Sequence, residues 1–133
     1  MTDHELLSGF EDCTLANEAF HHEEHVRVAF LYLSRYPALV ALERFSTALS
    51  RFAKAHGKTK LYHETVTWAY ILLIQERLAR AGGTQSWPEF RSANPDLLDR
   101  KRDILKKYYQ AETLQSDLAK HTFLFPDRCP EQR

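Results

Sequence analysis

The residues most able to do chemistry in this chain are its seven histidines among 133 residues. Three of them, His21, His22 and His25, lie close together just before an apolar segment. If this segment is helical, the apolar positions from 26 to 33 set the direction of the core. His22 then points toward the core, His25 lies on its flank and His21 points away. His22 and His25 are an i, i+3 pair, so both rings are able to contact one ion or ligand.

A further histidine lies near the start of a second strongly apolar segment. Tyr62 and His63 straddle the core direction that the apolar residues from 66 to 73 define. Both histidine groups therefore lie near the N-terminal ends of expected helices. The first and third helices of an up-down bundle run parallel, which predicts that His22, His25 and His63 meet at one end of the core.

Three neutral imidazoles suit zinc, iron, copper or nickel. Three protein ligands that leave one position open are typical of catalytic metal sites. We therefore expect a small metalloenzyme with an exchangeable position for water, oxygen or substrate, and both hydrolysis and oxygen chemistry remain open. The predicted metal ligands are His22, His25 and His63. The predicted catalytic group consists of these three histidines together with Glu18 and Tyr62. The residues predicted to bind the ligand are Tyr32 and Thr67.

Other interpretations of the same residues belong to different classes. Without a metal, the histidines would form an acid–base site, since histidine titrates near neutral pH. Alternatively the protein is a non-catalytic helical module that binds a small ligand or a protein partner. The histidines would then form a buried hydrogen-bond network, because burying polar rings without partners is costly. Lys58 and Lys60 precede the second histidine segment, where they would either bind an anion or be solvated.

Helical periodicity and helix-ending residues predict the elements that position these side chains. Pro37 separates two amphipathic segments, and glycines 57 and 82 follow the ends of others. We expect an all-α fold, a four-helix up-down bundle with one or two additional short C-terminal helices, in a single domain over residues 1–133. Residues 1–14 are expected to be a polar lead-in with a few apolar anchors, Leu6, Leu7 and Phe10. The expected helices are 17–36, 38–56, 60–81, 94–109 and a short one near 112–121.

The composition excludes several classes of protein. Lys and Arg number 18, as do Asp and Glu, so the basic surplus of a nucleic-acid clamp is missing. The apolar run from Trp68 to Ile74 is too short for a membrane span. Cys13 and Cys129 do not make a disulfide framework. We expect a cytoplasmic protein that takes a small-molecule substrate or ligand and no nucleic acid or membrane, with a homodimer contact at Trp68 as an open option.

Two segments carry a resemblance to other proteins. The sequence Phe20-His21-His22-x-x-His25-Val26, followed by Tyr62-His63-Glu64-Thr65-Val66-Thr67, resembles a group of small bacterial helical proteins of unassigned function. The resemblance covers roughly residues 17–80, and a weaker similarity is found at residues 108–109 and 125–127. It implies that the two segments belong to one pattern and implies no activity. A looser similarity to DinB-like and hemerythrin-like bundles rests on helix-borne histidines, which those proteins place around a metal with different spacings.

Overall fold

The computed structural model describes residues 1–128, and these residues contain α-helices, short 3-10 helices and no strand. The predicted all-α class is therefore confirmed for this part of the chain. Cys129 lies outside the described residues. The helices are α1 (Asp3–Glu11), α2 (His22–Arg35), α3 (Ala38–Ala55), α4 (Glu64–Ala81), α5 (Trp87–Ala93), α6 (Ala111–Gln115) and α7 (Asp117–His121), with 3-10 turns η1 (Asn17–Ala19), η2 (Thr59–Leu61), η3 (Pro95–Leu97) and η4 (Ile104–Lys107).

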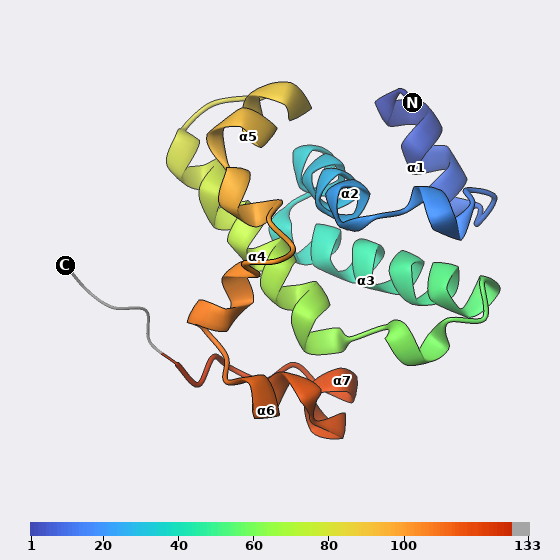
Figure 1. Cartoon of the computed structure of the whole chain (residues 1–133). Helices are drawn as coiled ribbons and strands as arrows, with labels where there is room; N and C mark the ends of the chain where they lie inside the picture. Colours follow the sequence, from blue (N-terminus) through green and yellow to red (C-terminus); the bar gives the residue numbers. More distant parts are fainter. Residues whose placement is uncertain (129–133) are drawn as a thin grey trace.

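Helices α2, α3 and α4 form the centre of the molecule and pack against one another (Figure 1). Pro37 separates α2 from α3, and Gly82 ends α4 in the left-handed conformation with φ 77°. These three helices match three of the predicted segments within a few residues. The up-down arrangement is not confirmed. In Figure 1, α2 is viewed nearly end-on while α3 lies across the view, so these neighbours cross instead of running side by side.

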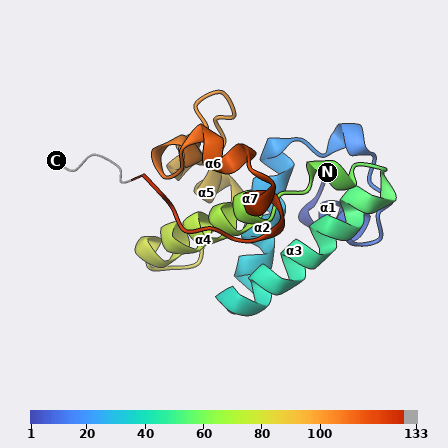
Figure 2. The same ribbon diagram turned by 90° about the horizontal axis from the view of Figure 1, so that it is seen from below.

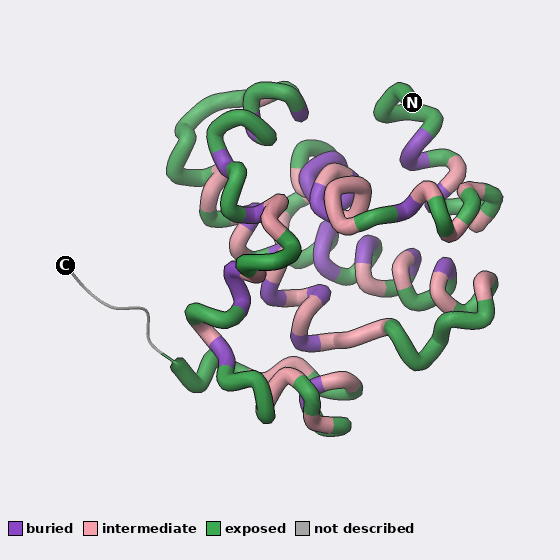
Figure 3. Tube along the Cα trace, in the orientation of Figure 1, coloured by how far each residue is buried: buried purple, intermediate pink, exposed green. Residues whose placement is uncertain are grey.

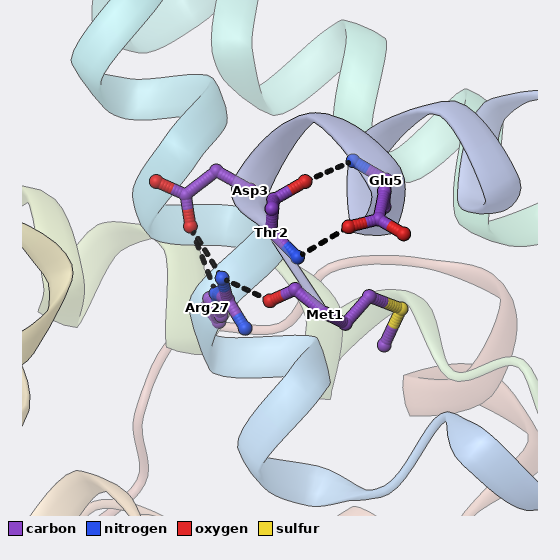
Figure 4. Close-up of polar contacts among 5 residues, drawn as sticks. All are labelled: Met1, Thr2, Asp3, Glu5 and Arg27. Carbon is purple, nitrogen blue, oxygen red and sulfur yellow. Dashed lines mark hydrogen bonds and ion pairs between the residues drawn. The ribbon is translucent and has the colours of Figure 1, made fainter.

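The N-terminal segment corrects the expectation of a polar lead-in, because it forms helix α1. The Thr2 side chain accepts the Glu5 N–H, and the Glu5 carboxylate accepts the Thr2 N–H, which completes a capping box. Arg27 of α2 then ties the start of this helix to the body, with its guanidinium 2.6 Å from the Asp3 carboxylate and 3.1 Å from the Met1 carbonyl oxygen (Figure 4). This helix buries Leu6, Leu7 and Phe10.

Residues 94–109 correct a second expectation, because the helix predicted there is not formed. Two aspartate side chains bond to nearby backbone in place of helical hydrogen bonds. Asp99 accepts the N–H groups of Lys101 and Arg102, and Asp103 accepts the N–H of Leu105. Such local bonds compete with helix formation. The segment therefore runs through the turns η3 and η4 (Figure 1), although its apolar residues still reach the core.

The C-terminal part of the described chain lies along α4, where α7 is its neighbour (Figure 2). The Thr65 hydroxyl donates to the Thr122 carbonyl oxygen at 2.8 Å and accepts the Leu124 N–H at 3.1 Å. The Phe123 ring stacks on Trp68 at 5.0 Å. Trp68 is thus partly covered by its own chain, and its buried indole N–H has no partner within residues 1–128. A homodimer contact at Trp68 stays a prediction.

The buried residues concentrate between α2 and α3 and around α4 (Figure 3). In the described chain, none of the helices combines the length and the apolar character that crossing a membrane requires. Helix α2 contacts α1, α3, α4 and α5, so it is the most central element. The predicted histidine pair lies at the N-terminal end of this helix.

Candidate functional site

A cavity of about 400 Å³ lies between α2, α3 and α4. This volume is in the range of pockets that hold a small organic molecule. Its walls are largely apolar, and small residues such as Ala29 and Ala53 leave the space that larger side chains would fill. The predicted metal ligands His22, His25 and His63 all line it, together with Tyr62, Thr67 and Tyr70.

His22 is the first residue of α2, and its ring is held in place from two sides. Its Nε2 lies 2.9 Å from the Leu97 carbonyl oxygen, and its ring packs edge-on against Tyr70 with centroids 5.1 Å apart. A carbonyl oxygen only accepts, so Nε2 carries the proton and donates. The Nδ1 atom is then an acceptor, and it makes no hydrogen bond within the described residues.

His25 lies one turn further along α2, and its ring packs on Phe20 with centroids 4.1 Å apart. Neither of its ring nitrogens makes a hydrogen bond within residues 1–128, although the residue is only partly exposed. Burial lowers the pKa of His25 to about 3, and the nearby His22 and Arg100 add to the effect. His25 is therefore neutral near pH 7, with one N–H to donate and one nitrogen to accept.

His63 is the N-cap of α4, one residue before the helix begins. Its Nδ1 accepts the Val66 N–H at 3.2 Å, and its Nε2 donates to the Leu114 carbonyl oxygen at 2.6 Å. Both ring nitrogens are thus engaged. The sequence predicted a helix from residue 60, so the capping role was missed, because histidine is not among the usual N-cap residues.

The hydroxyl groups at the cavity also have partners. Tyr62 donates to Glu64 at 2.6 Å, Tyr70 donates to Asp103 at 2.6 Å, and Thr67 donates to the His63 carbonyl oxygen at 2.7 Å. Burial, followed by the bond to its carboxylate, raises the pKa of each tyrosine above its ordinary value. Neither phenol is therefore a source of protons near neutral pH.

Two predicted site residues do not line the cavity. Glu18 lies exposed in the turn η1 and not on α2, because the helix begins at His22 and the chain before it bends away. Tyr32 lies in the core on the side of α1, where its hydroxyl donates to Glu11 at 2.6 Å. His21 is exposed beside Glu24, as the helical wheel predicted. Glu18 and Tyr32 are therefore removed from the group that surrounds the histidines.

The described residues contain no group of three or more His, Cys, Asp and Glu side chains arranged to hold a metal ion. Among the three predicted ligands, the nitrogens without partners in the described chain belong to His22 and His25. A metal bound by His63 would have to displace either the Val66 cap or the Leu114 bond. The three-histidine metal centre and its zinc, iron, copper or nickel ion therefore stay a prediction.

Two cationic side chains, Arg100 and Lys58, also line the cavity, and neither was predicted to do so from the sequence. Arg100 comes from the segment 94–109 that was expected to be a helix, and Lys58 comes from the turn after α3. The turn at Asp99 that places Arg100 depends on side-chain bonds to backbone, which leave only a weak signal in the sequence. Lys58 was noted as part of a basic loop, but nothing in its spacing connected it to the histidines.

Comparison with known protein families, with curated proteins and with solved structures finds no match for this chain. The resemblance carried by residues 20–26 and 62–67 therefore stays a prediction.

Proposed function

We propose that this protein binds a small organic molecule in the cavity between α2, α3 and α4. The observation that carries the proposal is the cavity itself, about 400 Å³ with apolar walls and a few polar groups that converge on it. Small-molecule sites in proteins have this composition, in which the apolar walls supply affinity and the polar groups fix orientation.

The histidines support binding more directly than catalysis. His63 uses both ring nitrogens to hold the start of α4 and the segment at Leu114, which is a structural role. His22 is fixed by the Leu97 carbonyl, and it offers one acceptor to the cavity. His25 offers a donor and an acceptor without a partner in the described chain. Donor and acceptor groups of this kind suit hydrogen bonding to a ligand.

The proposal is tested with N-phenylnaphthylamine, an uncharged probe whose fluorescence rises in apolar surroundings. We expect the probe to bind the wild-type protein. The substitution Ala53→Phe places a ring in the cavity, and we expect it to weaken binding about tenfold or more, since it removes the space for the probe.

Ala55→Phe is the matched control, because Ala55 lies on the same helix and is exposed. It should bind the probe as the wild type does, and circular dichroism should show that both variants keep their helices. Probe binding that is absent, or that is equal in both variants, would contradict the proposal.

Elemental analysis of the untagged protein separates this proposal from the metalloenzyme hypothesis. Near-stoichiometric zinc, iron, copper or nickel that is lost in a His25→Gln variant would favour a metal centre over an organic ligand. A protein that carries no such metal and takes none up on titration, yet binds the probe in the cavity, would support the binding function.

A further inference from the structure

We infer that the ligand of this cavity is an amphiphile with an anionic oxygen head group, such as a carboxylate, sulfonate or phosphate, held by Arg100 and His25. The inference rests on the proposed binding function and names the chemical class of its ligand. Three observations carry it: the sign of the charges around the cavity, the absence of a partner for Arg100, and the kind of hydrogen-bonding groups that remain unused.

The charged residues that line the cavity are Arg100 and Lys58, and no Asp or Glu of the described chain lines it. Asp103 and Glu64 do not line the cavity, and each carboxylate accepts a hydrogen bond from the hydroxyl of a lining tyrosine, Tyr70 or Tyr62. A cleft with low-dielectric walls and charges of one sign concentrates the field and attracts the opposite sign. The cavity is therefore suited to an anion.

Arg100 differs from the arginines that stabilise the fold. Arg27, Arg77, Arg80 and Arg91 each pair with a carboxylate within the described chain. Arg100 is an exposed residue that makes no ion pair or hydrogen bond with residues 1–128, and it differs from the likewise exposed Arg102 in lining the cavity and in lying close enough to affect His25 and Tyr70. A guanidinium is well matched to the two oxygens of a carboxylate or to a phosphate, which it binds through paired N–H groups.

The hydrogen-bonding groups of the cavity that lack partners in the described chain include both donors and acceptors, and the acceptors are the Nδ1 of His22 and one nitrogen of His25. The phenol hydroxyls already donate to Glu64 and Asp103, so they do not compete for the ligand. The guanidinium of Arg100 and the N–H of the neutral His25 ring are the donors without partners. An oxygen anion accepts from both donors and is attracted by the guanidinium charge, whereas an ammonium group is repelled by that charge.

The rest of the cavity is suited to the apolar part of such a molecule. Val26 and Ala29 line it from α2, and Leu49 and Phe52 line it from α3. Contact with these side chains stabilises an aliphatic or aromatic body in proportion to the apolar area removed from water. The combination of cationic side chains and apolar walls selects against both simple inorganic anions and uncharged hydrocarbons.

The test compares two probes with the same skeleton. Anilinonaphthalene sulfonate differs from N-phenylnaphthylamine by its sulfonate group. We expect the anionic probe to bind the wild-type protein at least about tenfold more tightly, with an advantage that shrinks as salt is added. Arg100→Gln should remove most of this advantage, so the variant should lose more affinity for the anionic probe than for the neutral probe.

Arg102→Gln is the matched control, since Arg102 is an exposed arginine of the same segment that does not line the cavity. It should leave both affinities unchanged. Equal affinity for the two probes, or an equal loss in the two arginine variants, would overturn the inference and leave the binding function standing. If neither probe binds in a manner sensitive to Ala53→Phe, the binding function itself fails.

A displacement experiment, in which candidate ligands compete with the bound anionic probe, identifies the head group. Decanoate, decyl phosphate and decanol share one aliphatic chain, and each is titrated against bound anilinonaphthalene sulfonate. Stronger displacement by either anion than by decanol supports the inference, and the better of the two anions names the head group. Displacement by decanol that equals that of both anions overturns it.

Discussion

The space on one side of α3 is filled and the space on the other side is hollow. Between α1, α2 and α3, Phe10 is fully buried and stacks on Phe20 at 5.1 Å and on Phe45 at 5.9 Å. Between α2, α3 and α4, the same two aromatic residues form part of the wall of the cavity. The filled side has α1 to supply a large side chain, whereas no such side chain of the described chain lies between the walls of the hollow side, which include Ala29 and Ala53.

This difference separates residues that hold the fold from residues that are available for a ligand. In the filled region, every ring contacts other rings, and the Tyr32 hydroxyl has its own acceptor in Glu11. Around the cavity, polar atoms of His22 and His25 lack partners in the described chain. A substitution should therefore reduce stability on one side and binding on the other.

The largest effect on stability is expected for Phe10→Ala. The change removes a fully buried ring from the filled region, which typically lowers the free energy of unfolding by about 3–5 kcal/mol. Urea unfolding followed by circular dichroism measures this loss. Phe125→Ala is the control, because Phe125 is 83% exposed and should change the free energy of unfolding by less than about 0.5 kcal/mol. Similar losses in both variants would show that the filled region is not the stabilising part.

A smaller loss is expected for His63→Ala, which removes both the cap of α4 and the bond to Leu114. Loss of an N-cap together with a side-chain hydrogen bond should cost about 1–3 kcal/mol. His63→Asn separates the cap from the bond to Leu114, since asparagine caps a helix but is too short to reach the Leu114 carbonyl oxygen as the imidazole does. We expect the asparagine variant to recover part of the loss. If alanine is neutral in urea unfolding, His63 does not have the structural role described here.

The smallest effect is expected in the pH dependence of stability. His25 has a folded pKa of about 3 against an ordinary value of 6.5, so below about pH 6.5 the unfolded chain takes up a proton that the folded chain does not. The free energy of unfolding should therefore fall as pH falls, by less than about 1.4 kcal/mol per pH unit, because the side chain is partly exposed.

The matched variant for this measurement is His25→Gln, which keeps a polar side chain that does not titrate. Urea unfolding between about pH 7 and about pH 5 should show a flatter slope in the variant, since exposed carboxylates with lowered pKa values stay ionised there. An unchanged slope would assign the pH dependence to another group.

The central helices could be predicted from sequence because their apolar periodicity is long and their ends have clear signals. Pro37 and Gly82 mark two of these ends. Helix α1 was missed because nine residues carry too little periodicity for detection. The prediction of a helix at 94–109 was wrong because it was based on the spacing of apolar residues. It did not include the hydrogen bonds that the Asp99 and Asp103 side chains accept from nearby backbone N–H groups.

The site was predicted only in part, for a different physical reason. Helical geometry correctly directs His22 and His25 toward a common space and His21 outward, since those directions depend on neighbouring residues alone. Arg100 reaches the same space through a turn and a tertiary approach that periodicity does not describe. Tyr32 was misplaced because the partner of its hydroxyl, Glu11, lies on a helix that the sequence analysis did not expect.

The ring of His63 connects two segments that are far apart in the chain. Its Nδ1 accepts a hydrogen bond from the Val66 N–H, and its Nε2 donates to the carbonyl oxygen of Leu114, which lies 51 residues after His63. Local opening of a protein proceeds in cooperative units that hydrogen exchange can resolve. When the segment around α6 and α7 detaches from α4, this ring loses its second anchor. Exchange of the Val66 amide should therefore follow the opening of the C-terminal segment, so that the start of α4 and residues 111–124 open as one unit.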